Sequence, residues 1–412
     1  MNRPRSLLRL GLVTACAGLL AAGAAAGGLD GLDIRIGKAL FERAWVPAPS
    51  STKADDGLGP LFDARSCASC HPADRRARTS VDAQGHLDGR GMVLVLAQKD
   101  GKGDPVYGRR LQIDAVPGLA PEGILGVTDT ALPDGLTRRV PAPDALAYGP
   151  LSPATGLSLR TAPDLRGRGL LEQVPEPALL ALEADQGKGP DAVHGRLRRV
   201  TLPDGATAIG RYGWKAAQPT LASQSAEAFF LDMGLSTPMH PEPWGDCTEA
   251  QAACRAAPHG RDGEDGFEIP DALLSRVVAY VTSLPVPETP KDGVGARLFA
   301  ATGCAACHRP ALPTAGGGQA RLFTDLMLHD LGPGLADTMP EPGAAAGEWR
   351  TAPLAGLSDA LARDTGLLHD GRARSVEEAV LRHAGQAETA VRRFRALPAG
   401  RKAALLAYVS KL

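Results

Sequence analysis

The sequence has few aromatic residues and no excess of either charge. Phe, Trp and Tyr make up 4% of the 412 residues, and 45 Lys and Arg stand against 46 Asp and Glu. A chain without a basic excess cannot neutralise many phosphates, which argues against a general nucleic-acid-binding protein. With so few aromatic rings, and with 49 Gly and 34 Pro, we expect a loop-rich protein in which another group fills part of the core.

Long apolar runs are also missing from the sequence after its N-terminus, so no later segment is expected to span a bilayer. Residues 1–26 carry arginines ahead of an apolar run that ends in small residues, which is the pattern of a secretory signal peptide. We therefore expect an exported, periplasmic protein. Residues 13–16 also resemble a lipobox, so a lipoprotein held at the membrane through Cys16 is the alternative.

The seven cysteines fall into three groups. Cys16 lies in the predicted signal peptide, four cysteines form two Cys-x-x-Cys pairs, and Cys247 and Cys254 remain. Disulfides persist outside the cytosol. We therefore expect Cys247 and Cys254 to form a local disulfide that closes a short surface loop.

The chain contains two copies of one unit, with four landmarks in the same order. Each copy has a Leu-Phe pair (61–62 and 298–299), a Cys-x-x-Cys-His motif, an Arg-Thr-Ala-Pro segment and a closing helix with Ala-Tyr-Val. The Pro-rich segment 285–293 is the expected linker. This organisation predicts an N-terminal domain at 28–285 and a C-terminal domain at 286–412.

A histidine directly follows each Cys-x-x-Cys pair. The two motifs consist of Cys67, Cys70 and His71, and of Cys304, Cys307 and His308. Covalent attachment of a c-type haem needs two thiols that add to its vinyl groups and an adjacent imidazole that binds its iron. A thioredoxin-like pair would follow a strand in a βαβ pattern, which is missing, and a zinc site would leave both histidines unexplained. The motifs therefore predict two covalently attached c-type haems.

These motifs, together with the helical periodicity of 271–284, predict a mainly α fold made of two cytochrome c-like haem domains. The N-terminal domain is about twice as long as the C-terminal one, and segments 91–98 and 198–213 have the alternating pattern of strands. Pro-Asp-Gly within 198–213 predicts a hairpin. We expect loop and β-ribbon insertions to enlarge the first domain.

The second axial ligand decides whether each haem reacts or only transfers electrons. For the C-terminal haem we predict His383, at the end of a helix that starts after Ser375 and has Glu378 as its capping-box partner. His369 in the preceding loop is the rival ligand. The alternative for His383 is a histidine that lies at the edge of a core and binds no iron. For the N-terminal haem the candidate is Met233, with simple packing as the alternative.

Several segments together resemble a known family: ARSCASCH, RGRGLLEQVPE, IGRYGWKAAQP, AFFLDMG and the C-terminal run from LFTDLMLHDLG through RTAPLAGL to VLRHAG. They resemble the bacterial di-haem oxidoreductases, often labelled thiol oxidoreductase or peroxidase. This family is related to the di-haem cytochrome c peroxidases and to the di-haem enzymes that mature methylamine dehydrogenase. The resemblance implies an N-terminal reactive haem and a C-terminal electron-relay haem.

The resemblance also implies roles for single residues. His369 begins the matching loop of the peroxidases, and His383 takes the place of their distal Met, which lowers the expected potential of that haem. Trp214 matches a Trp between the haems, with core packing as the alternative. Asp232 lies near the position of the acid that helps to cleave peroxide, where this chain has no Glu. His329 matches a position near the C-terminal haem, which we interpret as a hydrogen bond to a propionate.

The expected function is therefore that of an exported, peroxidase-like di-haem oxidoreductase. Its expected partners are a small redox protein or another electron donor, and a small oxidant such as hydrogen peroxide. A di-haem electron-transfer cytochrome without catalysis is one alternative, and a tailoring oxidase that acts on a protein or peptide is another. Calcium, at the domain interface, is a further cofactor that the resemblance allows.

Overall fold

The computed structural model describes residues 31–412, apart from 53–55, 89, 132–136, 190–192, 262–265 and 292. The predicted signal peptide and its Cys16 lie outside the described residues. Among the described helices, none combines the length and the apolar character that crossing a bilayer requires.

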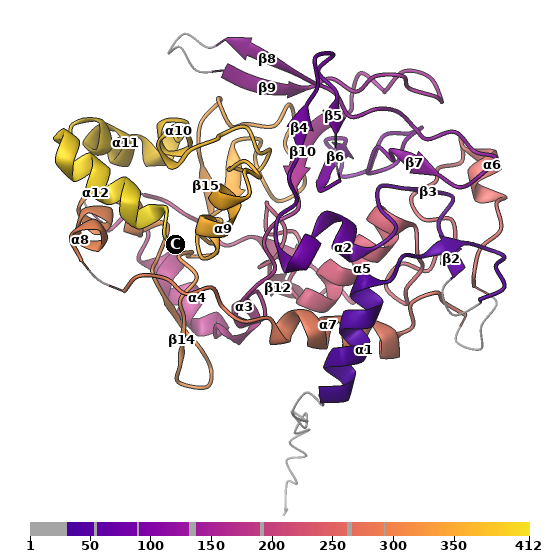
Figure 1. The fold of residues 1–412 in the computed structure, drawn as a ribbon, viewed down its shortest axis with the longest axis horizontal. Coiled ribbons are helices and arrows are strands. Elements are labelled where there is room, and N and C mark those ends of the chain that lie inside the picture. The colour runs from indigo at the N-terminus through magenta and orange to yellow at the C-terminus, as the bar shows by residue number, and fades with distance from the viewer. Residues whose placement is uncertain are drawn as a thin grey trace, which may run out of the picture.

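Each Cys-x-x-Cys-His motif contacts one helix of a packed pair (Figure 1). In the N-terminal part α1 (Gly31–Glu42) packs against α7 (Asp271–Ser283), and in the C-terminal part α8 (Val294–Ala301) packs against α12 (Ala399–Val409). The apolar face predicted for α7 is confirmed, because its members at 274, 277 and 281 are buried. The two halves of the chain therefore share one helical scaffold.

A glycine lets the helices of each pair approach closely. A Cβ atom on Gly37 would lie 1.9 Å from the carbonyl oxygen of Arg276, and one on Gly295 would lie 2.2 Å from the Cβ atom of Tyr408. Both distances are far below van der Waals contact. Any larger residue at these two positions would push the helices apart.

An aromatic contact repeats in the same way. The rings of Phe41 and Tyr280 meet edge to face with centroids 5.4 Å apart, and those of Phe299 and Tyr408 do so at 5.9 Å. The structure thus matches Phe299 with Phe41 in α1. Our sequence match of the two Leu-Phe pairs was wrong, because the first pair forms strand β3 (Leu61–Phe62).

The prediction of a mainly α fold is wrong as well. The structure is 29% helix and 18% strand, and the described strands pair two by two into many small sheets. Glycine and proline interrupt the long segment after the first motif too often for helices to persist. The backbone there satisfies its hydrogen bonds in short ribbons instead.

The paired strands are β1 (Val46–Pro47) with β2 (Asp56–Leu58), β3 with β7 (Asp114–Ala115), β4 (Ser80–Val81) with β5 (Leu87–Asp88), β6 (Met92–Ala97) with β10 (Gly156–Thr161), β8 (Val127–Ala131) with β9 (Thr137–Pro141), β11 (Arg199–Thr201) with β12 (Thr207–Ile209), β13 (Leu312–Pro313) with β14 (Gln319–Ala320), and β15 (Leu328–Asp330) with β16 (Glu348–Arg350). All are antiparallel except β1 with β2.

The other helices are α2 (Cys67–Cys70), α3 (Leu170–Gln173), α4 (Glu176–Ala184), α5 (Leu221–Met233), α6 (Ala252–Arg255), α9 (Leu357–Ala362), α10 (Val376–Leu381) and α11 (Glu388–Arg395), with 3₁₀ turns η1 (Pro72–Asp74), η2 (Cys304–Ala306) and η3 (Gly385–Ala387).

The two segments predicted to be extended are confirmed as strands. The hairpin β11–β12 turns at the predicted Pro-Asp-Gly, where Gly205 has a φ of +83° and the side chain of Asp204 accepts the N–H of Ala206 at 2.9 Å. Strand β6 pairs with the distant β10 rather than with a neighbour in the chain. The β8–β9 ribbon projects from the top of the molecule in Figure 1.

The hydrophobic core of the N-terminal part also receives residues from the C-terminal part. This core centres on α1, α5 and α7. A second core joins α8 and α12, and a third lies under β6 and β10. The residues from beyond the predicted linker that pack into the first core are Leu312, Ala320, Leu322, Leu326, Met327 and Ala355. The two motif-bearing parts are thus joined by shared apolar packing.

Candidate functional site

One cavity of about 470 Å³ brings together the predicted haem-related residues. The predicted attachment, ligand and catalytic residues that line it are Cys67, Cys70, His71, Trp214, Asp232, Met233, Cys304, Cys307, His308 and His383. Its volume is typical of pockets that hold small molecules and cofactors. Because both motifs contribute to the wall, the cavity extends between the two halves of the chain.

The N-terminal motif places a neutral imidazole on the cavity wall. Ser66 caps the short helix α2, since its side chain accepts the N–H of Ser69 at 3.1 Å. The Nδ1 atom of His71 lies 2.9 Å from the carbonyl oxygen of Pro163. A carbonyl only accepts, so Nδ1 carries the proton and Nε2 keeps its lone pair. Burial lowers the pKa of His71 to about 4, which keeps the ring neutral as iron ligation requires.

The C-terminal motif repeats this arrangement with a different partner. The Nδ1 atom of His308 lies 3.1 Å from the carbonyl oxygen of Phe323 and so donates its proton there. Burial, followed by the neighbouring His383, lowers the pKa of His308 to about 4. Both motif histidines are therefore held by a backbone carbonyl, the outer contact that fixes the orientation of a metal-binding imidazole.

His383 reaches the cavity from the end of α10. The helix begins as predicted, because the side chain of Ser375 accepts the N–H of Glu378 at 3.1 Å. The Nδ1 atom of His383 lies 2.7 Å from the carbonyl oxygen of Ala379, which again leaves Nε2 with its lone pair. Burial lowers the pKa of His383, so this ring is also neutral.

His369, the rival ligand, lies in an aromatic layer. Its ring stacks on Trp349 with centroids 3.7 Å apart and meets Trp214 edge to face at 6.3 Å. Both candidates line the cavity, and of the two His383 is the one close enough for its protonation to lower the pKa of His308. This favours His383 as the residue that faces the C-terminal motif histidine.

Trp214 connects the two halves of the cavity wall. Its indole Nε1 donates to the carbonyl oxygen of Thr161 at 2.7 Å, and its own carbonyl accepts the N–H of Arg350 at 2.9 Å. With its edge contact to His369, it touches segments of both motif-bearing parts. Its position between two haems and its role stay predictions.

Met233 and Asp232, the candidates for the side of the N-terminal haem opposite His71, both make other contacts. Met233 is 2% exposed and packs in the first core, although it also reaches the cavity. A carboxylate oxygen of Asp232 lies 2.7 Å from a guanidinium nitrogen of Arg110. Burial, and then the charge of Asp232, raise the pKa of Cys67 and of Cys70 to about 12. Asp232 therefore lies beside the predicted attachment thiols.

A second acid at this wall was missed from the sequence. Glu227, on the same helix α5, lines the cavity and pairs with Arg109 at 3.2 Å. Counting residues from Trp214 led past it to Asp232. Helical spacing would not have pointed to it, because Glu227 and Asp232 are five positions apart in α5 and so do not share one helix face.

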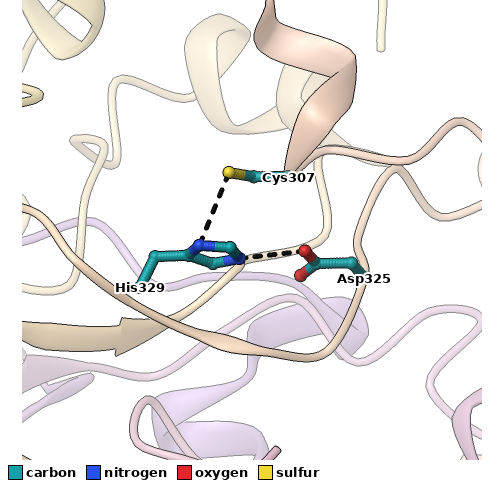
Figure 2. A group of neighbouring side chains, drawn as sticks. All are labelled: Cys307, Asp325 and His329. Carbon is teal, nitrogen blue, oxygen red and sulfur yellow. Dashed lines mark hydrogen bonds and ion pairs between the residues drawn. The ribbon is translucent and has the colours of Figure 1, made fainter. Parts of the chain in front are cut away.

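His329 lies beside the C-terminal motif, and its hydrogen bond to a propionate stays a prediction. Figure 2 shows its ring between the side chains of Cys307 and Asp325. Its Nδ1 atom lies 3.7 Å from the sulfur of Cys307, and its Nε2 atom lies 2.9 Å from a carboxylate oxygen of Asp325. Among the described residues, Cys307, Asp325 and His329 form a group whose ligand atoms lie close enough to one another to hold a single metal ion. Sulfur and imidazole are not calcium ligands, so it offers no site for the predicted calcium.

Whether a haem suits this cavity can be judged from three arginines on its wall: Arg76, Arg168 and Arg350. Their hydrogen-bond acceptors among the described residues are uncharged oxygens, namely the carbonyls of Asp164, Gly213, Thr351 and Leu368 and the hydroxyl of Thr161. The Nη1 atom of Arg168 and the Nε atom of Arg76 are buried without a partner. Burial, and then the charge of Arg168, lower the pKa of Arg350 to about 10.

Carboxylates act on these arginines only from beyond ion-pair distance among the described residues, and buried cations without a direct ion pair are costly, so this wall suits a ligand that brings negative charge. A haem carries two propionates on an otherwise apolar ring. The arginines, the apolar space and the four cysteines in two attachment motifs thus fit such a group. The sequence did not single out these arginines.

The structure also joins Cys247 to Cys254 in a disulfide, with Cα atoms 6.1 Å apart. Its two sulfurs lie in a small cluster with Leu61, away from the cavity wall. It therefore has no part in the site.

Comparison with known proteins identifies one family. The family described as "Di-haem oxidoreductase, putative peroxidase" matches residues 155–412, which is more than half of the chain and includes the second motif but not the first. No curated protein matches. Among solved structures, hydrazine synthase of Kuenenia stuttgartiensis, pressurized with 20 bar xenon, is similar over 100% of both chains at 13% identity, with a TM-score of 0.41. A likeness of that size carries no functional argument.

Proposed function

This chain belongs to the di-haem oxidoreductase family, and we propose that it is an exported, peroxidase-like enzyme with two covalently attached c-type haems. The residues that would attach and ligate them are Cys67, Cys70 and His71 for the N-terminal haem, and Cys304, Cys307 and His308 for the C-terminal haem.

One observation supports this assignment best. Both motif histidines line one cavity, and each donates Nδ1–H to a backbone carbonyl, so that Nε2 keeps the lone pair that iron needs. A redox disulfide has no use for an oriented imidazole. The unpaired arginines of the same wall add the positive charge that propionates would neutralise.

The surroundings of the two motifs support different roles for the two haems. His383 would be the second axial ligand of the C-terminal haem, because its ring is neutral, faces His308 and keeps Nε2 free. Two imidazoles give a low potential and suit electron relay. For the N-terminal haem the candidate second ligand is Met233, which packs in the core. We propose that this haem keeps the exchangeable position.

When bound, the haems would supply one-electron storage and a place where a small oxidant such as hydrogen peroxide can be reduced. The chain itself would supply protons and insulation. Asp232 is our candidate acid, since burial raises its pKa and so favours a carboxyl that holds a proton. Glu227 is the neighbouring alternative. Trp214 would lie on the path between the two halves.

The electrons would come from a small redox protein or another donor in the periplasm. The predicted signal peptide supports export, and a lipid on Cys16 would hold the protein at the membrane. Calcium is a further candidate cofactor, which metal analysis of the purified protein would detect.

The test is a purified protein from a host that attaches c-type haems. We expect a mass with two haems added and an optical spectrum in which one ferric haem responds to hydrogen peroxide. Two low-spin ferric haems that peroxide leaves unchanged would make the chain an electron carrier. A long-lived oxidised species without oxidation of small cytochromes would favour the tailoring oxidase.

A further inference from the structure

Two buried groups hold the ring of His329 from both sides. His329 lies in β15 and is 2% exposed, and Asp325 is fully buried. The Nε2 atom of His329 lies 2.9 Å from a carboxylate oxygen of Asp325 (Figure 2). Its Nδ1 atom lies 3.0 Å from the side-chain oxygen of Gln386. Each ring nitrogen therefore meets an oxygen atom.

The side chain of Gln386 cannot be turned the other way without losing two bonds. Its Oε1 accepts the N–H of His194 at 3.1 Å, and its Nε2 donates to the carbonyl of the same residue at 3.3 Å. In a flipped amide, the Nε2 donor would face the N–H of His194, and the Oε1 acceptor would face the carbonyl oxygen of His194. The atom that faces His329 is thus an acceptor.

Since both ring nitrogens of His329 face acceptors, both carry protons and the ring is an imidazolium. Burial lowers the pKa of His329 and its hydrogen bond to Asp325 raises it, and Asp325 is the partner that persists once Cys307 is a thioether. This positive charge lies 3.7 Å from the sulfur of Cys307.

The sulfur atoms of the first motif have buried acids, rather than a histidine cation, in their surroundings. The carboxylate of Asp232 acts on both Cys67 and Cys70, and that of Asp63 acts on Cys70. Asp63 is itself 2% exposed. Asp232 lies 2.7 Å from Arg110, and burial raises the pKa of both Asp232 and Asp63, so the surroundings of the first motif differ from the cation beside Cys307.

We propose that His329 is a positioning residue that places a fixed positive charge beside the Cys307 thioether and thereby raises the redox potential of the C-terminal haem. The proposal rests on the function proposed above. Reduction of ferric to ferrous iron removes one positive charge from the haem, so a nearby cation favours the reduced state. The cation thus offsets part of the lowering that a second imidazole causes.

The test measures both midpoint potentials by spectroelectrochemical titration in the holoprotein. His329→Gln keeps a hydrogen-bonding side chain but removes the charge, so the potential of the C-terminal haem should fall while that of the N-terminal haem stays. His329→Lys keeps a positive charge and should stay closer to the wild-type potential than His329→Gln does. His86→Gln is a matched control, because it removes a histidine paired with Asp144 at 3.2 Å that does not line the cavity. It should shift neither potential.

An unchanged C-terminal potential in His329→Gln would overturn the proposal. So would equal shifts in the Gln and Lys variants, because charge would then not be the cause. Loss of the second haem from the His329→Gln protein, read from its mass, would assign His329 to attachment instead and also overturn the proposal. A wild-type mass with fewer than two haems would refute the proposed function itself, whatever the potentials.

Discussion

The two Cys-x-x-Cys-His motifs share a scaffold and differ in their neighbours. Both contact a helix pair that crosses at a glycine, and both hold the Nδ1 atom of their histidine on a carbonyl. The second motif has His383 and the cation of His329 nearby, whereas the first has the carboxylate of Asp232. Under the proposed function, one attachment unit would take two redox roles, because the residues around it come from elsewhere in the chain.

Removing His383 should have the largest effect on this contrast. In His383→Ala the C-terminal haem loses one of two imidazoles, so the bis-imidazole signature in the electron paramagnetic resonance spectrum should disappear and the potential should rise. His369→Ala is the control and should keep the signature, since that ring stacks on Trp349. If the signature is lost in His369→Ala and kept in His383→Ala, the ligand assignment is wrong.

The second largest effect is expected from replacing Asp232, the candidate acid near the N-terminal motif. Asp232→Asn should slow the reduction of peroxide by about 100-fold, the low end of the usual contribution of a positioned acid. Stopped-flow mixing of the reduced protein with peroxide measures the rate. Glu227→Gln changes the neighbouring carboxyl of the same helix and should have a much smaller effect. The reverse ranking would make Glu227 the acid.

The charge of the wall between the motifs is tested by Arg168→Gln. In the haem-loaded protein the change removes a buried charged hydrogen-bond donor and should lower the free energy of unfolding by about 1.5–3 kcal/mol. In haem-free protein, made without the attachment machinery, it removes an unpaired cation and should raise the stability. Arg166→Gln is the control. Arg166 pairs with Asp164 at 2.7 Å, so its loss should change the free energy of unfolding by the same amount in the haem-loaded and haem-free forms. Urea unfolding of both forms measures this change.

The shared scaffold gives the smallest expected effect. Gly37→Ala and Gly295→Ala each force a methyl group into the partner helix and should each lower the free energy of unfolding by about 1–3 kcal/mol. Gly400→Ala, also in a helix but with open space around it, should instead stabilise by about 0.5–1 kcal/mol. If urea unfolding shows a lower free energy of unfolding for only one of the two variants, the two helix pairs are not structurally equivalent.

Features that depend on a few neighbouring residues could be predicted from the sequence. The N-cap at Ser375, the hairpin at Pro-Asp-Gly and the buried face of α7 are confirmed, because each follows from local backbone chemistry or helical spacing. The place of His383 on the cavity wall follows in the same way from the helix that carries it. Family membership was also predicted correctly, from motifs spread along the chain.

Features that depend on distant partners could not be predicted. The fold class was wrong because many strands are short and some, such as β10, pair with a segment some sixty residues away, which leaves a weak signal in the strand itself. The Leu-Phe match failed because an inserted stretch separates α1 from the first motif. Arg168 and Glu227 were missed because nothing local marks a surface-type residue that tertiary packing buries at a cavity.

By itself, the sequence determined which family the chain joins and predicted where haem would be attached, because thiol and imidazole chemistry needs only neighbouring residues. Only the tertiary structure decided what each attachment site has around it. The cation at Cys307, the carboxylate at Cys70 and the unpaired arginines between them come from segments far apart in the chain. Electrostatic effects act through space and grow with burial, so their sign at each motif emerges only once the chain has folded.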